Sequence, residues 1–428
     1  ASFDPAAREL TAEACRAAGF QKLTLLEEPQ AALYSWIQAS GGQWRKQVQS
    51  GEIILVVDVG GGTTDLSLIA VLEKDGGLEL QRVAVGEHIL LGGDNMDLAL
   101  AYGVARKLAQ EGKQLDAWQT RALAHGCRQA KEQLLADATL QSVPVVVPSR
   151  GSKLIGGSIR TEVTRDEVLQ MLVELGLPYA QDAAVTRHLA AFLSRQAGAT
   201  EQIEGLQGTQ PEGASFLHPS AILFNGGVLK APQIEQRILE VVNGWLAGEG
   251  AQPARLLDGA NLDLAVARGA AYFGHVAAAG RGVRIRGGTA QSYYVGVESN
   301  MPAIPGMEPP ISALCLAPFG MEEGTEVALD TQEFGLVVGE PVRLRFFGSS
   351  VRRADQVGTV LDFWGPEELV ELQEIEAHLP AEGRAPGEIV PVTLHARVTD
   401  IGTLELNAVP VGGDERWKVE FDVRADVA

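Results

Sequence analysis

A glycine-rich turn between two apolar stretches is the strongest chemical signal in this sequence. The turn consists of Gly60, Gly61, Gly62, Thr63 and Thr64. Such a run brings backbone N–H groups close to a polyphosphate, because glycine has no side chain and adopts conformations that other residues avoid. Asp58 and Asp65 flank the turn, and two carboxylates beside a phosphate require a cation between them. The turn therefore predicts a phosphate site with Mg²⁺ held by Asp58 and Asp65 through water.

A second glycine turn, Asn225-Gly226-Gly227, lies between the apolar stretch 220–224 and a helical pattern. In a doubly wound sheet a ligand binds where a strand ends and a helix begins. Each turn alone has an ordinary alternative: a glycine hairpin with solvated acids, or a simple loop. Two turns that both follow apolar strands favour the binding site.

Hydrophobic periodicity predicts the elements that position these turns. The continuous apolar run 53–57 is typical of a strand buried on both faces, and further strands are expected at 66–71 and 78–85. Helices are expected over 5–20, from Pro29, over 94–108, over 121–135 and over 261–276. Another helix after Gly227 is predicted to bury one face, made of Ile234, Ile238, Val241 and Trp245.

The pattern changes after Gly282 from helical spacing to strict alternation. Val342, Leu344 and Phe346 alternate with arginines, and the same period recurs at 390–394 and 417–423. Alternation over several strands that are separated by Gly and Pro turns indicates an antiparallel sandwich. We therefore expect a separate β domain over 285–428.

Composition excludes several classes of function. The chain has 428 residues and a formal net charge of −20 at pH 7, without a basic block. Neither nucleic acid nor an anionic membrane surface is therefore expected as a partner, and no apolar run is long enough to span a bilayer. Its three cysteines lie far apart, which favours reduced thiols in a cytoplasmic protein. His88 lacks a second ligand at useful spacing and is expected to be an ordinary loop histidine.

Six segments resemble, in order and spacing, the seventy-kilodalton heat-shock (DnaK-type) chaperones. They are Ala1–Arg8, Glu27–Leu33, Asp58–Asp65, Leu91–Asp94, Asn225–Gly227 and Asn261–Ala271. The resemblance covers nearly all of residues 1–280, but only the strand pattern in the β domain. The chain resembles a divergent member of the family.

The resemblance implies an α/β actin-like (ribonuclease H-like) ATPase fold with a partial first lobe, followed by an antiparallel β-sandwich domain. Residues 1–50 would be the remainder of the first ATPase lobe. Residues 51–280 would be the second lobe, with a helical subdomain inserted at about 115–215. Residues 285–428 would resemble the substrate-binding domain. The family's first phosphate loop and catalytic lysine would precede residue 1, so we expect an N-terminally incomplete chain.

Site roles also follow from the resemblance. Glu28, Asp58, Thr63 and Asp65 would be catalytic, while Arg8 and Pro29 would couple the nucleotide state to the partner domain. The nucleotide-binding set would comprise the first turn (Gly60 to Thr64) with Gly92, Gly93, Arg128, Lys131, Glu132, Gly226, Gly227, Lys230 and Asp263. The face of the helix 121–135 that is turned to the ligand would carry Arg128, Lys131, Glu132 and Leu135.

Two departures from the family bear on function. Arg128 stands where the family has an acid and Glu132 where it has an arginine, while Lys230 replaces the other stacking arginine. Glu132 cannot stack on a purine as a guanidinium does. The connection to the β domain, Arg281–Arg286, is basic, whereas the relatives use an apolar and acidic linker.

The function predicted from these observations is an ATP-binding, chaperone-like protein of the cytoplasm. With ATP or ADP and Mg²⁺ bound, it would couple nucleotide state to a β-sandwich that binds unfolded or extended peptide, with co-chaperones as further partners. The alternative is a non-hydrolysing nucleotide-binding scaffold on the same fold. A sugar kinase or filament protein fits less well, because those relatives lack the Glu-Pro-x-Ala-Ala segment and a sandwich of this size.

Overall fold

The computed structural model describes most of the chain. It describes all residues except 1–4, 21, 75, 87, 149–157, 175–184, 204, 259–260, 280–281, 287, 290, 299–309, 323, 373–374, 379–382, 400–403, 414 and 420–428. Two compact units result. Unit 1 comprises residues 1–27, 201–207 and 285–428, and unit 2 comprises residues 28–200 and 208–284.

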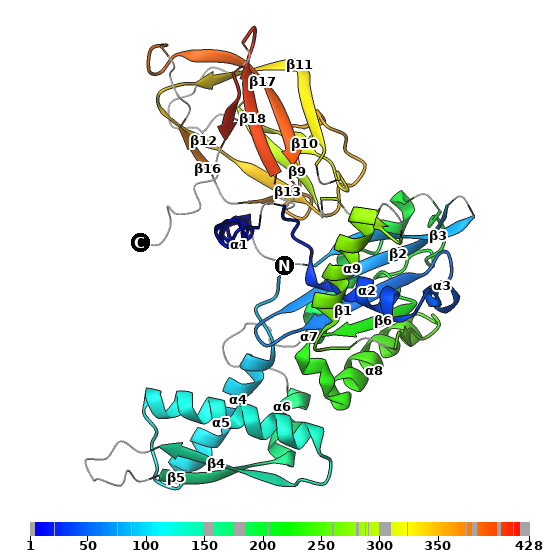
Figure 1. Cartoon of the computed structure of the whole chain (residues 1–428), viewed down its shortest axis with the longest axis vertical. Coiled ribbons are helices and arrows are strands. Elements are labelled where there is room, and N and C mark those ends of the chain that lie inside the picture. Colours follow the sequence, from blue (N-terminus) through cyan, green and yellow to red (C-terminus); the bar gives the residue numbers. More distant parts are fainter. Residues whose placement is uncertain are drawn as a thin grey trace. The chain divides into compact units, whose positions relative to one another are not determined.

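Unit 2 is built on a mixed sheet in which the strands run in the order β7-β6-β1-β2-β3 (Figure 1). The strands are β1 (Ile53–Val59), β2 (Thr64–Lys74), β3 (Gly77–Val85), β6 (Ala221–Asn225) and β7 (Arg255–Leu256). β1 pairs antiparallel with β2 and parallel with β6. Every residue of β1 is buried, which confirms the central strand predicted from its apolar run.

Helices flank this sheet. They are α2 (Glu28–Ala39), α3 (Trp44–Gln47), α7 (Val185–Arg195), the short 3₁₀ helix η2 (Gly227–Lys230), α8 (Pro232–Gly248) and α9 (Ala265–Ala279). α2 and α9 pack closely, since Gly269 has no Cβ to overlap the carbonyl oxygen of Ala31. Small residues in α9 thus allow α2 to lie against the sheet.

The buried face of α8 differs from the prediction. Ile234 and Ile238 are buried as expected, but Val242 and Leu246 complete the face instead of Val241 and Trp245. In a helix of 3.6 residues per turn, successive four-residue steps turn slowly around the axis, so the buried stripe drifts away from the side that carries Val241 and Trp245. The bulky indole of Trp245 therefore lies at the edge of the stripe, half-buried.

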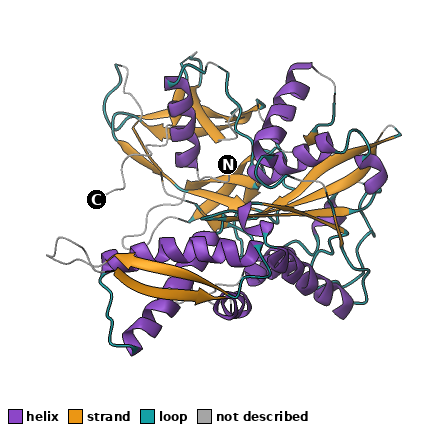
Figure 2. Cartoon of the chain, turned by 60° about the horizontal axis from the view of Figure 1, so that its bottom comes forward, coloured by secondary structure: helices purple, strands orange, loops and turns teal. Residues whose placement is uncertain are grey.

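A helical layer with a hairpin is inserted between β3 and β6. It contains α4 (Gly93–Gln110), α5 (Ala117–Ala136), β4 (Ser142–Pro148), β5 (Ser158–Thr164) and α6 (Arg165–Glu174). Figure 2 shows the two strands lying along a long helix, which is α5. This approach depends on Gly126, because a Cβ there would come 2.5 Å from Cγ1 of Val145.

Unit 1 contains mainly antiparallel strands. Its elements are α1 (Pro5–Ala17), β8 (Ile285–Arg286), β9 (Ser292–Glu298), β10 (Ile311–Ala317), β11 (Glu326–Val337), β12 (Pro341–Leu344), β13 (Phe346–Ser349), β14 (Val360–Leu361), β15 (Val370–Glu371), β16 (Ile375–His378), β17 (Ile389–Val398), β18 (Leu404–Pro410) and β19 (Trp417–Val419), with the 3₁₀ helix η1 (Ala199–Gln202) at the boundary with unit 2. The sheet β14-β10-β9-β13-β15 and the sheet β11-β17-β18-β19 share one apolar core, in which Val295 and Leu314 meet Val392 and Trp417. The predicted alternation is confirmed in β17, where Val390, Val392 and Leu394 are buried. The expected positions 421 and 423 lie outside the described residues.

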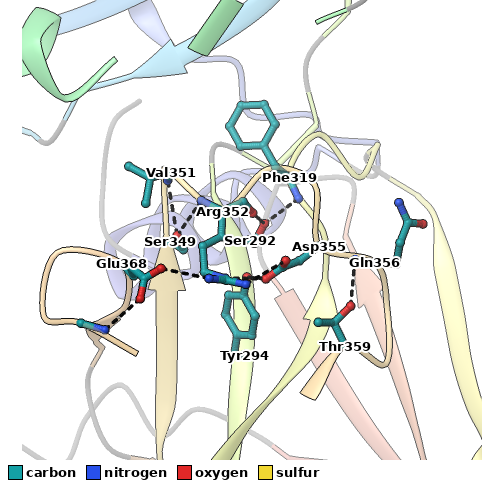
Figure 3. A network of polar contacts seen from close by, with 11 residues as sticks. Ser292, Tyr294, Phe319, Ser349, Val351, Arg352, Asp355, Gln356, Thr359 and Glu368 are labelled. Carbon is teal, nitrogen blue, oxygen red and sulfur yellow. Dashed lines mark hydrogen bonds and ion pairs between the residues drawn. The ribbon is translucent and has the colours of Figure 1, made fainter. Parts of the chain in front are cut away.

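A polar network fixes two loops to the outer face of β9 (Figure 3). Nε of Arg352 donates to Asp355 at 2.8 Å, and its Nη1 donates to Glu368 at 3.0 Å. The hydroxyl of Tyr294 also donates to Asp355, at 2.7 Å, and Ser292 donates to the carbonyl of Arg352. Because one guanidinium joins both loops, its partners hold them over the strand as one assembly.

None of the helices in the described part of the chain combines the length and the apolar character that crossing a bilayer requires.

Candidate functional site

Strand register brings three polar residues together at the carboxyl end of β1. Asp58 is the direct partner of Asp65 on β2 and of Asn225 on β6. All three are buried, with exposed fractions of 3%, 5% and 2%. Buried polar groups of this kind need hydrogen-bond partners or a ligand.

Asp58 occupies the centre of this group. Nδ2 of Asn225 donates to Oδ2 of Asp58 at 2.7 Å. Burial is the main cause that raises the pKa of Asp58 to about 6. The hydrogen bond from Asn225 opposes this rise, and the nearby negative charges of Glu28 and Asp65 contribute to it. The ionised carboxylate is therefore costly in the free protein, and a cation would relieve that cost.

Asp65 is engaged differently. Its Oδ1 lies 2.9 Å from Nδ1 of His88, and its Oδ2 accepts a long hydrogen bond of 3.4 Å from the hydroxyl of Thr63. His88 lies in a loop, as expected, and its ring is in addition a partner of the predicted metal acid. Sequence spacing could not reveal this contact, because it depends on how the segment after β3 returns to Thr64, with which Ile89 pairs.

The first glycine turn, Gly60–Thr64, lies against the turn Gly92–Gly93 at the start of α4. Gly93 donates its N–H to the carbonyl of Gly60 at 3.0 Å, and Asp94 donates to Gly61 at 2.7 Å. A Cβ at Gly92 would come 2.5 Å from the carbonyl oxygen of Gly61, so glycine is needed for this contact. The backbone bonds hold the first turn against the start of α4.

The third turn joins them from β6. Gly226 has a φ of 95°, in the left-handed region that favours glycine, and a Cβ there would overlap the carbonyl of Val59. Val228 lies next to Gly93, since a Cβ at Gly93 would be 3.1 Å from its Cγ2. The three glycine turns that were recognised separately in the sequence thus form one cluster.

The cluster has an open side. A Cβ at Gly62 or Gly227 would meet no described atom within 4 Å. Within the residues that the structure describes, the N–H groups of Gly61 and Gly62 donate no hydrogen bond. Free backbone donors beside open space are what an anionic phosphate requires.

Of the four residues of α5 that were expected to face a ligand, two are buried and two are exposed. Lys131 is buried, and its Nζ lies 2.7 Å from Oδ1 of Asp97 and donates to the carbonyl of Gly93 at 3.0 Å. Leu135 is also buried. Arg128 and Glu132 are exposed and pair with each other at 3.1 Å. Lys131 therefore supports the glycine turn from behind.

A buried ion pair costs desolvation that its attraction does not fully repay, and burial raises the pKa of Asp97 despite the adjacent ammonium. We expect Lys131→Met to destabilise unit 2 by about 3 kcal/mol, because it leaves the carboxylate of Asp97 buried without its ammonium partner. The double variant K131M/D97L should lose less than about 1 kcal/mol. Urea unfolding measures both, and equal losses in the single and double variants would contradict this account.

The remaining predicted residues lie at the margin of the cluster. Lys230 and Asp263 are exposed and form an ion pair with each other. Glu28 is exposed at the first position of α2, and Pro29 is buried behind it. Arg8 belongs to α1, but its side chain is outside the described part of the structure.

The donor set agrees with a weakly coordinated divalent cation. Among the described residues, no three His, Cys, Asp or Glu side chains are grouped to hold a metal ion by themselves. Asp58 and the amide oxygen of Asn225 are hard oxygen donors, and Mg²⁺ typically keeps several waters and takes few protein ligands. The residues thus fit Mg²⁺ that is shared with phosphates.

Fold and site together define an α/β unit with a candidate phosphate site, joined in one chain to an antiparallel β unit. The family model described as Hsp70 protein matches residues 1–179. The relatives named "Chaperone protein HscA homolog" from Bordetella pertussis and Paracidovorax citrulli are 32% and 30% identical over 244 and 282 residues, covering 54% and 64% of this chain. The corresponding protein of Acinetobacter baylyi is 35% identical over 134 residues, or 31% of the chain.

These matches cover 36%, 36% and 20% of the length of the three relatives, respectively, so the chain spans about a third or less of each. The chain is thus similar to the Hsp70 family, through the family model over residues 1–179 and through partial matches to these relatives. This confirms the resemblance found in the sequence.

Proposed function

We propose that unit 2 binds ATP or ADP with Mg²⁺ at the three glycine turns, and that the protein is a chaperone. One observation carries the nucleotide proposal: the three turns converge on the buried Asp58, with free N–H donors at Gly61 and Gly62. The proposal assigns an actin-like ATPase fold to residues 1–280, with the first lobe ending near residue 50. It assigns a substrate-binding β-sandwich to residues 285–428.

The residues of this chain would divide the work as follows. Gly61 and Gly62 donate backbone hydrogen bonds to phosphate oxygens, and the hydroxyl of Thr63 lies beside them. Glu28, close enough to influence the pKa of Asp58, orients the attacking water. Mg²⁺, when bound, neutralises charge on the phosphates. Arg8 and Pro29 are proposed to pass the nucleotide state to the β unit.

The proposed partners follow from the family. The printed names of the relatives describe chaperones, which supports unfolded or extended peptide as the ligand of the β unit, with co-chaperones as further partners. We propose the cytoplasm as the place of action, because ATP is available there. The antiparallel sheets of unit 1 offer backbone edges to which an extended peptide adds as a strand.

One observation favours a second function, that of a non-hydrolysing scaffold. Arg128 pairs with Glu132, and Lys230 pairs with Asp263. The charged groups predicted to contact the nucleoside therefore already satisfy one another. A protein that keeps the fold for partner binding would tolerate such pairs, whereas a tight nucleotide site would have to open them.

Titration of Mg-ATP distinguishes the two functions. We expect this 428-residue chain to bind Mg-ATP in calorimetry and to hydrolyse it in a single-turnover measurement. Absence of binding would refute the nucleotide proposal, and binding without turnover would support the scaffold.

A further inference from the structure

The carboxyl end of β6 holds a buried polar atom whose hydrogen bonding is incomplete. Asn225 is 2% exposed, and its Nδ2 donates to Asp58. Its Oδ1 accepts no hydrogen bond from any described residue. A buried carbonyl oxygen without a donor is destabilising unless a water, an ion or another ligand meets it.

The direction of this oxygen is fixed by its neighbour. An ionised carboxylate has only acceptors, so the amide nitrogen of Asn225 must face Asp58 and the oxygen must face away from Oδ2. Oδ1 of Asp58 likewise accepts no hydrogen bond within the described part of the chain. Two adjacent parallel strands thus end in two oxygens that are without donors.

Asp65 is less available than Asp58. One of its oxygens meets His88 at 2.9 Å and the other meets Thr63 at 3.4 Å. The two acids predicted from the sequence, Asp58 and Asp65, therefore do not both have a side-chain oxygen that accepts no hydrogen bond. Asp58 and Asn225 each have one.

We propose that Oδ1 of Asn225 and the carboxylate of Asp58 together bind a hydrated divalent cation. Carboxylate and side-chain carbonyl oxygens are the ligands that such cations take, and Mg²⁺ retains water at its other positions. The proposal rests on the proposed function in one respect: phosphates of the nucleotide complete the cation's surroundings. It adds a specific residue, Asn225, which the sequence had marked only as part of a turn.

Binding of Mn²⁺, followed by electron paramagnetic resonance with and without ADP, tests the proposal on the 428-residue chain. Asn225→Leu keeps the branched shape of the side chain and removes the oxygen, and we expect it to weaken Mn²⁺ binding at least about tenfold. Asn243→Leu is the matched control. It removes an amide of α8 that is fully engaged with the backbone of Ala254, and it should bind Mn²⁺ as the wild type does.

A second variant separates cation binding from mere support of Asp58. Asn225→Asp retains an oxygen but loses the donor to Asp58, so a supporting role predicts weaker Mn²⁺ binding. A direct role predicts binding at least as tight as in the wild type. Weaker binding by Asn225→Asp would therefore overturn the proposal.

The remaining outcomes are also decisive. Equal Mn²⁺ affinity in the wild type and Asn225→Leu, or no Mn²⁺ binding by any variant, overturns the cation site. Mn²⁺ binding that depends on Asn225 without any binding of ADP upholds the cation site and refutes the nucleotide function. Binding of ADP together with Mn²⁺ binding that does not depend on Asn225 upholds the nucleotide function and overturns the cation site.

Discussion

Asp58→Asn should make the free protein more stable at neutral pH while weakening its binding of Mg-nucleotide. The carboxylate of Asp58 is 3% exposed, and burial raises its pKa to about 6 from an ordinary value of 3.8. The folded state therefore binds more protons than the unfolded state between about pH 4 and pH 6. Stability must fall as pH rises through that window, and it remains lowered above it.

The neutral side chain of the variant removes this dependence. A shift of about two pKa units corresponds to roughly 3 kcal/mol, so Asp58→Asn should gain about 1–3 kcal/mol at pH 7 and almost nothing at pH 4. Urea unfolding of the chain without ligand at both pH values measures the gain.

A matched control is Asp166→Asn, which makes the same change in charge at an exposed position of unit 2. It should leave stability within about 0.5 kcal/mol at both pH values. Calorimetry with Mg-ADP then tests nucleotide binding, where we expect at least about a tenfold loss of affinity for Asp58→Asn. A variant that is less stable than the wild type at pH 7, or that binds as well, would show that Asp58 is a structural residue.

The sequence predicted the strands and turns of this site well, because each depends on a local pattern. The apolar run of β1 and the glycines of its turn were recognisable without a partner. Alternation in β17 likewise specified its buried face. Local patterns suffice wherever a segment's own periodicity decides what it buries.

The partners inside the site could not be predicted in the same way. Asn225 meets Asp58 across 167 residues of chain, and His88 meets Asp65 across 23. Lys131 was predicted to face a ligand from α5, but its burial against Asp97 depends on how α4 and α5 pack. These contacts are set by strand register and helix packing, which no single segment encodes.

Packing of α2 against α9 leads to the second large expected effect. Gly269→Ala should destabilise unit 2 by about 3 kcal/mol, because the added Cβ would overlap the carbonyl oxygen of Ala31. Backbone atoms cannot rotate away as a flexible side chain does, so α2 must shift. Glu28 begins that helix, and the shift should therefore also weaken Mg-nucleotide binding.

Helix α9 also provides a control position at which the same substitution should raise stability instead of lowering it. Gly274 is exposed in α9, and a Cβ there would meet no described atom within 4 Å. Gly274→Ala should stabilise the chain by about 0.5–1 kcal/mol, since alanine loses less backbone entropy in a helix. Chemical unfolding of both variants compares one substitution at two positions of one helix. Similar effects in the two would show that helix propensity, and not the contact with α2, governs stability here.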